Sequence, residues 1–215
     1  MKRAVKILIG AVVAIVLLAV AGMALLWYFM TQGPDLAKFE YLKEPQISTM
    51  PNQKVIVVEA KGDPNVVGEK AFGLLFRIYY KIKDAPKGLT PPAPRARWPV
   101  SLDTPKSEWL GLYALPVPAT TTELPQHDAQ AGLNVSLTKW EYGEVAEILH
   151  IGPYDQEQPT IKRLVDFINA QGYVIIGAHE EEYLKGPTMF SKGDPEKYAT
   201  IIRYQVKKSD ESQAM

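Results

Sequence analysis

The side chains of this sequence that could do chemistry are a few carboxylates and rings set in strand-like segments. Glu147 stands inside the apolar run 144–151. A carboxylate that points inward from such a run needs a partner, and Arg203 or Arg97 could supply one. The alternative is that Glu147 points outward on the exposed side of its strand, in which case it carries no chemistry.

The acidic run at 180–182 is a second candidate. In a strand, Glu180 and Glu182 would point to one face and Glu181 to the other. Two carboxylates act as an acid and a base when they converge and their pKa values are displaced in opposite directions. Nothing in the sequence makes these three converge, so we expect a solvated sheet edge here.

Aromatic residues are frequent in the expected strands, and aromatic rings can form a platform for a ligand. We take Trp109, Tyr113 and Tyr183 as candidate pocket residues, although strands favour aromatic residues in any case. The three histidines lack the spacing of metal ligands, so we expect structural or surface roles for them. They are His127, His150 and His179. The sequence therefore predicts no metal site, no cofactor and no identifiable catalytic residue.

Composition excludes several classes of protein. The 215 residues include 24 basic and 24 acidic ones and no cysteine, which excludes disulfides and thiolate chemistry. Residues 1–30 contain three basic residues and no acidic one, so residues 31–215 carry 21 basic against 24 acidic groups. A slightly acidic domain lacks the positive surface of a nucleic-acid binder.

The chain nearly repeats itself. Segments 46–64 and 136–154 share a β-prone run, a polar break, an apolar run and a Gly-Pro-type corner before an amphipathic helix. Val55 aligns with Val145 and Gly62 with Gly152. Strand patterns are expected at 54–60, 95–102, 109–117, 134–140, 144–151, 173–184 and 199–207, and helical patterns at 66–83 and 158–171. Helices on one face of an antiparallel sheet give an α+β fold.

Residues 7–30 contain no charged side chain, and Lys2, Arg3 and Lys6 precede them. This pattern predicts a transmembrane helix in the lipid bilayer, with residues 1–6 in the cytoplasm and the folded domain outside it. A cleaved signal peptide is the alternative. A juxtamembrane linker is expected at 31–44, the domain at 45–208 and a flexible tail at 209–215.

Several short motifs occur in an order that resembles a known family. They are 62–65 (GDPN), 148–154 (ILHIGPY), 171–173 (QGY), 182–184 (EYL), 194–195 (DP) and 200–206 (TIIRYQV). Together they resemble the GyrI-like small-molecule-binding domains, which include the effector-binding domains of AraC-type regulators. The resemblance implies two strand-helix-strand-strand modules, here about 45–118 and 133–208, in one curved antiparallel sheet with both helices on one face.

One departure from the family pattern concerns the last strand. In many members a Glu of this strand reaches the pocket, and the resemblance places Ile201 at that position. Arg203 points to the same face as Ile201 by strand alternation. If that face lines the pocket, neutral or anionic ligands become better candidates than lone cations. Arg203 on a solvated face, or paired with a nearby acid, is the alternative.

The resemblance implies a small molecule bound between the two modules. We expect non-catalytic binding by a membrane-tethered sensor, sequestering protein or accessory subunit, with an unidentified small molecule and a membrane protein as partners. A hydrolase of a reactive toxin and a protein-interaction module are the alternatives. The ligand-binding candidates are Trp109, Tyr113, Glu147, Tyr183, Ile201 and Arg203.

Overall fold

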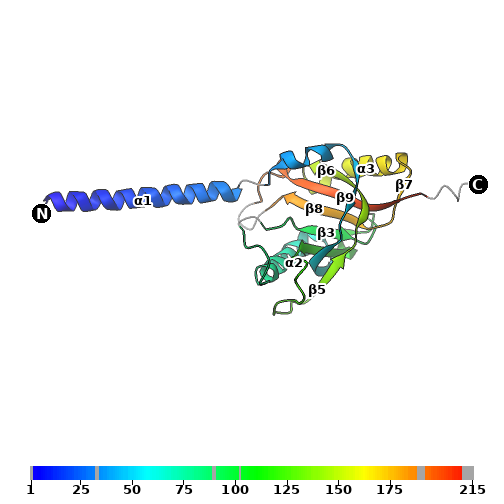
Figure 1. The fold of residues 1–215 in the computed structure, drawn as a ribbon, viewed down its shortest axis with the longest axis horizontal. Helices are drawn as coiled ribbons and strands as arrows, with labels where there is room; N and C mark the ends of the chain where they lie inside the picture. The colour runs from blue at the N-terminus through cyan, green and yellow to red at the C-terminus, as the bar shows by residue number, and fades with distance from the viewer. Residues whose placement is uncertain (1, 32–33, 89–90, 102, 188–191, 210–215) are drawn as a thin grey trace, which may run out of the picture. The chain divides into compact units, whose positions relative to one another are not determined.

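The computed structural model describes residues 2–31, 34–88, 91–101, 103–187 and 192–209. The chain divides into two compact units, residues 1–34 and residues 35–215, and each is described by itself. The first unit consists of one helix, α1 (Lys2–Thr31). The second contains all the strands and the remaining helices (Figure 1). The predicted tail lies outside the described residues from 210 onward.

The prediction of a membrane-spanning helix at 7–30 is overturned. Within the described part of the chain, no helix combines the length and the apolar character that a membrane crossing requires. The transmembrane element of the predicted fold, and the extracytoplasmic placement deduced from it, are corrected accordingly.

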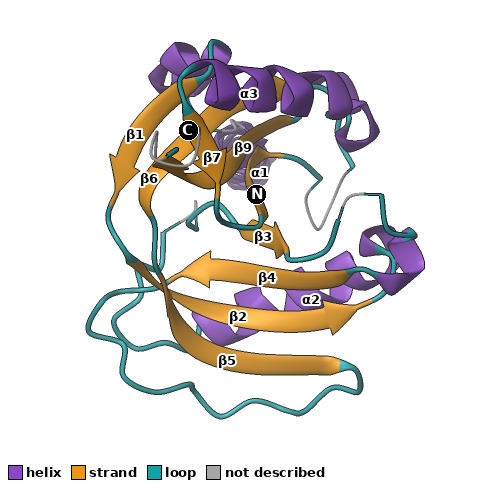
Figure 2. Ribbon diagram, turned by 90° about the vertical axis from the view of Figure 1, so that its right-hand side faces the viewer, coloured by secondary structure: helices purple, strands orange, loops and turns teal. Residues whose placement is uncertain are grey.

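The second unit is an antiparallel sheet in the order β1-β6-β9-β8-β3-β4-β2-β5, with β7 paired to β9 beside this path. The strands are β1 (Gln46–Met50), β2 (Gln53–Lys61), β3 (Arg95–Trp98), β4 (Leu110–Pro116), β5 (Leu133–Trp140), β6 (Gly143–Ile151), β7 (Tyr173–Ile175), β8 (His179–Lys185) and β9 (Ala199–Lys208). Two helices, α2 (Pro64–Tyr79) and α3 (Gln158–Ala170), complete the α+β architecture predicted for the domain (Figure 2). The short 3₁₀ turns are η1 (Leu36–Lys43), η2 (Lys106–Glu108), η3 (Tyr154–Gln156) and η4 (Pro195–Lys197).

The predicted repeat is present in the fold. One module is β2-α2-β3-β4 and the other is β6-α3-β8-β9, and they meet where β3 pairs with β8. Each module also borrows an outer strand, because β1 pairs with β6 and β5 pairs with β2. The single strand expected at 173–184 is two strands, since β7 and β8 are separated by residues 176–178.

Each helix covers the strands of its own module with apolar side chains. The α2 face (Ala71, Leu75, Ile78) packs on Ile56 and Leu115. The α3 face packs on the other half of the sheet, and its core consists of Ala146, Ile148, Ile161, Leu164, Ile168, Ile202, Tyr204 and Val206. Both helices begin with Pro in the first turn, where its fixed φ suits a helix start. The two cores flank the β3–β8 junction, and the site described next lies over that junction.

Candidate functional site

The pairing of β3 with β8 decides which acidic side chains share a face. Glu181 lies opposite Ala96 on one side and Ile202 on the other, and both neighbours belong to the helix-side cores. Glu181 therefore points to the face that carries α2 and α3, together with His179 and Tyr183 by strand alternation. Glu180 and Glu182 point to the opposite face. The predicted alternation of the acidic run is correct, but the solvated edge is wrong, because Glu180 and Glu181 are buried.

Glu181 is held as a charged acceptor by three donors. Oε1 accepts from Trp98 Nε1 at 3.1 Å and from His179 Nε2 at 2.9 Å, and Oε2 accepts from the Tyr183 hydroxyl at 2.5 Å. Burial opposes the charge, but the hydrogen bonds from His179, Tyr183 and Trp98 lower the pKa of Glu181 below its ordinary value. Glu181 is therefore a buried anion whose geometry is fixed by its neighbours.

Glu157 is a second acid beside Glu181, and its environment acts in the opposite direction. It lies just before α3 and only 5% of its surface is exposed. Burial, and next the negative charge of Glu181, raise the pKa of Glu157 to about 9. Among the described residues, the buried Oε1 of Glu157 has no hydrogen-bond partner. One side-chain atom from each of Glu157, His179 and Glu181 lies within 4.8 Å of the other two. We call these three residues the acid cluster.

Aromatic rings enclose the acid cluster from the α2 side. Tyr183 contacts Phe72 edge-to-face at a centroid distance of 5.6 Å and Tyr154 at 5.5 Å. Phe72 contacts Tyr113 at 5.1 Å, and Tyr113 contacts Trp98 at 5.6 Å. Rings offer their electron-rich faces to cations, so this wall suits a positively charged or aromatic molecule.

A hollow of about 480 Å³ opens beside the acid cluster. Its lining includes Trp98, His179 and Tyr204, with residues 99–101 and 176–178. His179 and Trp98 both hydrogen-bond to Glu181, so they connect the hollow to the buried acids. The volume is within the range of small-molecule sites. We call it the His179 hollow.

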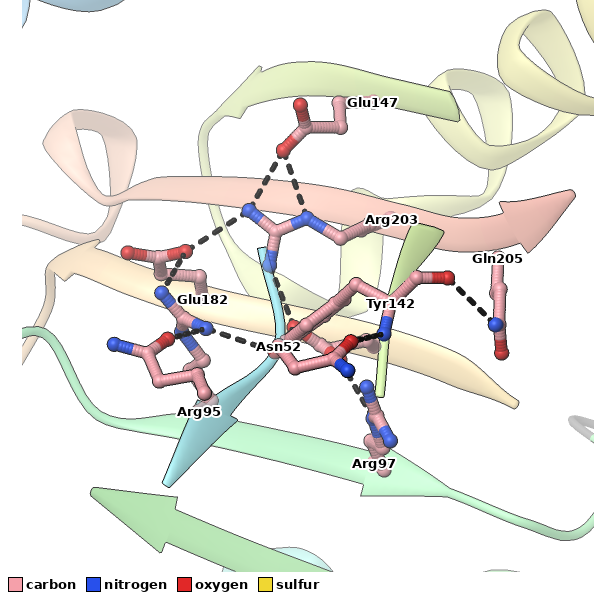
Figure 3. A network of polar contacts seen from close by, with 10 residues as sticks. Asn52, Arg95, Arg97, Tyr142, Glu147, Glu182, Arg203 and Gln205 are labelled. Atoms are coloured by element: carbon pink, nitrogen blue, oxygen red, sulfur yellow. Dashed lines mark hydrogen bonds and ion pairs between the residues drawn. The ribbon is translucent and has the colours of Figure 1, made fainter. Parts of the chain in front are cut away.

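The opposite face of the sheet carries an ionic network at the same junction (Figure 3). Arg203, 3% exposed, donates to Glu147 at 2.7 Å, to Glu180 at 2.5 Å and to Glu182 at 3.0 Å. Arg95 pairs with Glu182 at 3.1 Å. We call this the arginine network: Arg95, Arg97, Arg203, Glu147, Glu180, Glu182 and Tyr142.

The charges of the arginine network balance. Arg97 pairs with Glu180 at 2.6 Å, so three guanidinium groups face three carboxylates. The Tyr142 hydroxyl accepts from Arg95 at 2.8 Å and donates to Glu180 at 2.9 Å. Burial acts against the Glu180 charge, but Arg203 and then Arg97 lower its pKa. The network is a compensated structural element, with its cations already occupied.

The model of the GyrI-like small molecule binding domain family matches residues 43–207. The chain belongs to the GyrI-like family. A solved structure described as an uncharacterized conserved protein from Listeria innocua is 26% identical, with a TM-score of 0.64, over 80% of this chain and 99% of that one. No curated protein matches the sequence.

Two further structures share the fold of this GyrI-like chain. A structure described as a hydrolase from Listeria innocua is 24% identical, with a TM-score of 0.63, over 80% of this chain and 99% of that one. The C-terminal domain of EcmrR is 12% identical, with a TM-score of 0.56, over 77% of this chain and 98% of that one. At these identities the likeness shows the fold alone.

The six residues predicted to bind a ligand in this GyrI-like domain divide between the two faces of the sheet. Trp109, Tyr113 and Tyr183 lie in the helix-side core around α2 or against it. Glu147 and Arg203 pair with each other in the arginine network, which excludes an outward-facing Glu147. Arg203 was expected to line a pocket, to lie on a solvated face or to pair with a nearby acid, and the structure shows it paired with acids. Their roles in binding remain predictions.

Ile201 lies on the same face as Arg203 but apart from its charges. It packs in a separate apolar cluster with Leu42, Leu149 and Ala199. The face opposite the helices is thus filled by ion pairs at Arg203 and by aliphatic packing at Ile201. The six predicted residues do not form a single site.

Sequence reasoning did not single out Glu157, and it gave His179 a structural or surface role. Glu157 lies just before α3, which has Pro in its first turn. An acidic residue is common at such a position because it stabilises the helix N-terminus, so its presence there did not indicate a site. His179 is far from Glu157 in sequence, and only the sheet pairing with α3 above it brings them together. The one available signal was the alternation of 179, 181 and 183, which puts a His, a Glu and a Tyr on one face.

Proposed function

We propose that this protein binds a small molecule non-catalytically in the His179 hollow, against the acid cluster at the junction of the two modules. The observation that carries the proposal is the hollow itself. It opens beside a buried carboxylate that Trp98 and His179 hold in place. A hollow of this volume with a small number of fixed polar groups is the usual form of a small-molecule site. Membership of the GyrI-like family fits this role.

The charges around the hollow favour an organic cation with an aromatic or apolar body. Glu181 is kept ionised, and the rings of Trp98 and Tyr204 are close to the opening. The guanidinium group of Arg203 contacts three carboxylates on the other face, so it offers no open positive charge to an anion. The expectation of a neutral or anionic ligand rested on an open Arg203, and this geometry argues against it.

Thermal-shift measurements on the full chain test this proposal. Aromatic quaternary ammonium compounds should raise the melting temperature, and aromatic sulfonates of matched size should not. Glu181→Gln should remove the shift, because the neutral amide loses the attraction for the cation. Glu69→Gln, on the exposed side of α2, is the matched control and should keep it. Stabilisation by the sulfonates alone would overturn the proposal.

Hydrolysis of a reactive small molecule is the second candidate, because one observation favours it. Glu157 and Glu181 have pKa values displaced in opposite directions, which is how an acid and a base are set apart in one site. Glu181 would take a proton from water and Glu157 would give one to the leaving group. Incubation with a cyclopropane-bearing electrophile, followed by mass spectrometry for the addition of water, tests it. Product that forms equally with wild-type protein and with Glu181→Gln would exclude this role.

A further inference from the structure

We propose that Glu157, His179 and Glu181 bind one divalent first-row transition-metal ion between α3 and β8. The three residues offer two carboxylate oxygens and one imidazole nitrogen, all within 4.8 Å of one another and all buried. A tetrahedral ion about 2.1 Å from each atom places its ligand atoms about 3.4 Å apart. The cluster would therefore close by up to about 1.4 Å, which side-chain rotation can supply.

One buried carboxylate oxygen of the cluster points to a missing ligand. Within the described residues, Oε1 of Glu157 has no hydrogen-bond partner, although the residue is only 5% exposed. Thr200 and Glu181 both affect the pKa of Glu157 through its side chain, so they lie beside the same carboxyl group. Buried polar atoms are nearly always satisfied, and each exception needs an explanation. Glu157 contributes to the cluster, so an ion there would satisfy its carboxylate directly, and a water on that ion could reach neighbouring hydroxyls.

The surroundings of the cluster resemble the outer shell of a metal site. Nδ1 of His179 lies 2.9 Å from the Tyr204 hydroxyl. Nε2 of His179 donates to Glu181. An ion would take the place of that proton, and Nδ1 would then donate to the Tyr204 hydroxyl, as the second ring nitrogen of a metal-bound histidine commonly does. The hydroxyl of Tyr183 and the indole N–H of Trp98 orient the carboxylate of Glu181. Such contacts fix ligand orientation in metalloproteins.

The donor set selects the class of ion. Imidazole suits zinc, iron, copper and nickel, whereas carboxylates also accept manganese, so a mixed set fits Zn²⁺ and its neighbours better than Ca²⁺ or Mg²⁺. Three protein ligands leave a coordination position open. The His179 hollow is lined by His179 itself and provides a path for the ion and for a further ligand.

A calorimetric titration with Zn²⁺ tests the proposal. The full chain is first stripped of metal with EDTA, and the EDTA is then removed. We expect one ion per chain. Glu157→Gln and His179→Gln should each weaken binding by about 100-fold or more, and Tyr204→Phe by about 10-fold, because it removes only the outer contact. His127→Gln is the control for an unrelated histidine and should leave the affinity unchanged. Visible absorption of the Co²⁺ complex reports whether nitrogen and oxygen ligands surround the ion.

The Zn²⁺ titration tests the metal site independently of the proposed small-molecule function, because it contains no organic ligand. Far-ultraviolet circular dichroism of each variant shows that it is folded. If His127→Gln weakens Zn²⁺ binding as much as His179→Gln does, or if folded Glu157→Gln binds like the wild type, the metal site does not exist. A failure of the organic cations in the thermal-shift assay would leave this result untouched.

Discussion

Gly62 and Gly152 have the same backbone conformation at the same corner of the two modules, with φ of 133° and 137°. Each follows the first strand of its module and precedes its helix. The N–H of Gly62 donates to the carbonyl of Trp109 at 2.9 Å, and that of Gly152 to the carbonyl of Tyr198 at 3.1 Å. Trp109 and Tyr198 each stand just before the last strand of their module. The corner therefore ties the start of each helix to the sheet in the same way.

Replacement of either corner glycine by alanine should destabilise the domain. A residue with a Cβ is strained at these φ values, at a cost on the order of 1–3 kcal/mol. In Gly152→Ala the added carbon would also meet Nε2 of His150 at 3.4 Å. Urea unfolding of the full chain, followed by circular dichroism, measures the change.

Gly73→Ala provides the matched control of opposite sign. Gly73 lies inside α2, and its added carbon would meet only the flexible end of Arg77, at 3.5 Å. Alanine is the better helix former by about 1 kcal/mol, so this variant should be more stable than the wild type. Equal losses at Gly73 and Gly152 would show that the corner conformation carries no special cost.

The repeat could be predicted because local signals repeat with it. The glycine corners, the proline in the first turn of each helix and the apolar faces of α2 and α3 all come from short segments of sequence. The exchange of the outer strands could not be predicted. Pairing of β1 with β6 joins residues about 100 positions apart, and no local pattern distinguishes it from pairing within one module.

The site was predicted less well for a related reason. Glu180, Glu181 and Glu182 have the composition of a solvated edge, and only the neighbouring β3 strand makes them central. That strand brings Arg95 and Arg97 to one face and Trp98 to the other, which determines where each acid finds a partner. A single strand read alone contains none of this information.

Removal of Arg203 should destabilise the domain strongly. In Arg203→Met the carboxylates of Glu147, Glu180 and Glu182 lose their shared buried cation, and such a loss costs about 3–5 kcal/mol. Arg163→Met removes an exposed pair with Glu44 and should cost less than about 1 kcal/mol. Urea unfolding measures the loss of unfolding free energy in each variant, and a larger loss for Arg203→Met shows that its ion pairs are buried. Similar values for both would mean that Arg203 is open to solvent.

Removal of the Tyr142 hydroxyl tests the centre of the same network. Tyr142→Phe leaves Arg95 without one acceptor and Glu180 without one donor in a buried place. We expect a loss of about 1–3 kcal/mol, because unsatisfied buried polar groups carry their full desolvation penalty. Tyr80→Phe, at an exposed position on the same protein, should be nearly neutral. Thermal unfolding at pH 7 compares the two, and a loss confined to Tyr142→Phe is the expected result.

The ionisation of Glu157, the buried acid on the helix side of the sheet, should make the stability of the domain depend on pH. The pKa of Glu157 is about 9 in the folded chain, against about 4.3 in an unfolded one. Between these values the folded state binds more protons, so its stability falls as pH rises, by up to about 1.4 kcal/mol per pH unit. The lowered pKa of Glu180 acts the other way, since its contribution is lost as pH falls below the unfolded value.

Glu157→Gln isolates the first of these effects. The amide cannot ionise, so the variant should keep its stability from pH 5 to pH 8.5, whereas the wild type loses stability over the same range. The acid-side loss caused by Glu180 should remain in both proteins. Urea unfolding at each pH, in EDTA so that no metal ion replaces the proton, measures the slopes. Parallel slopes for the two proteins above pH 5 would mean that Glu157 is ionised in the folded state at neutral pH, and that Glu157 and Glu181 do not have opposite protonation states.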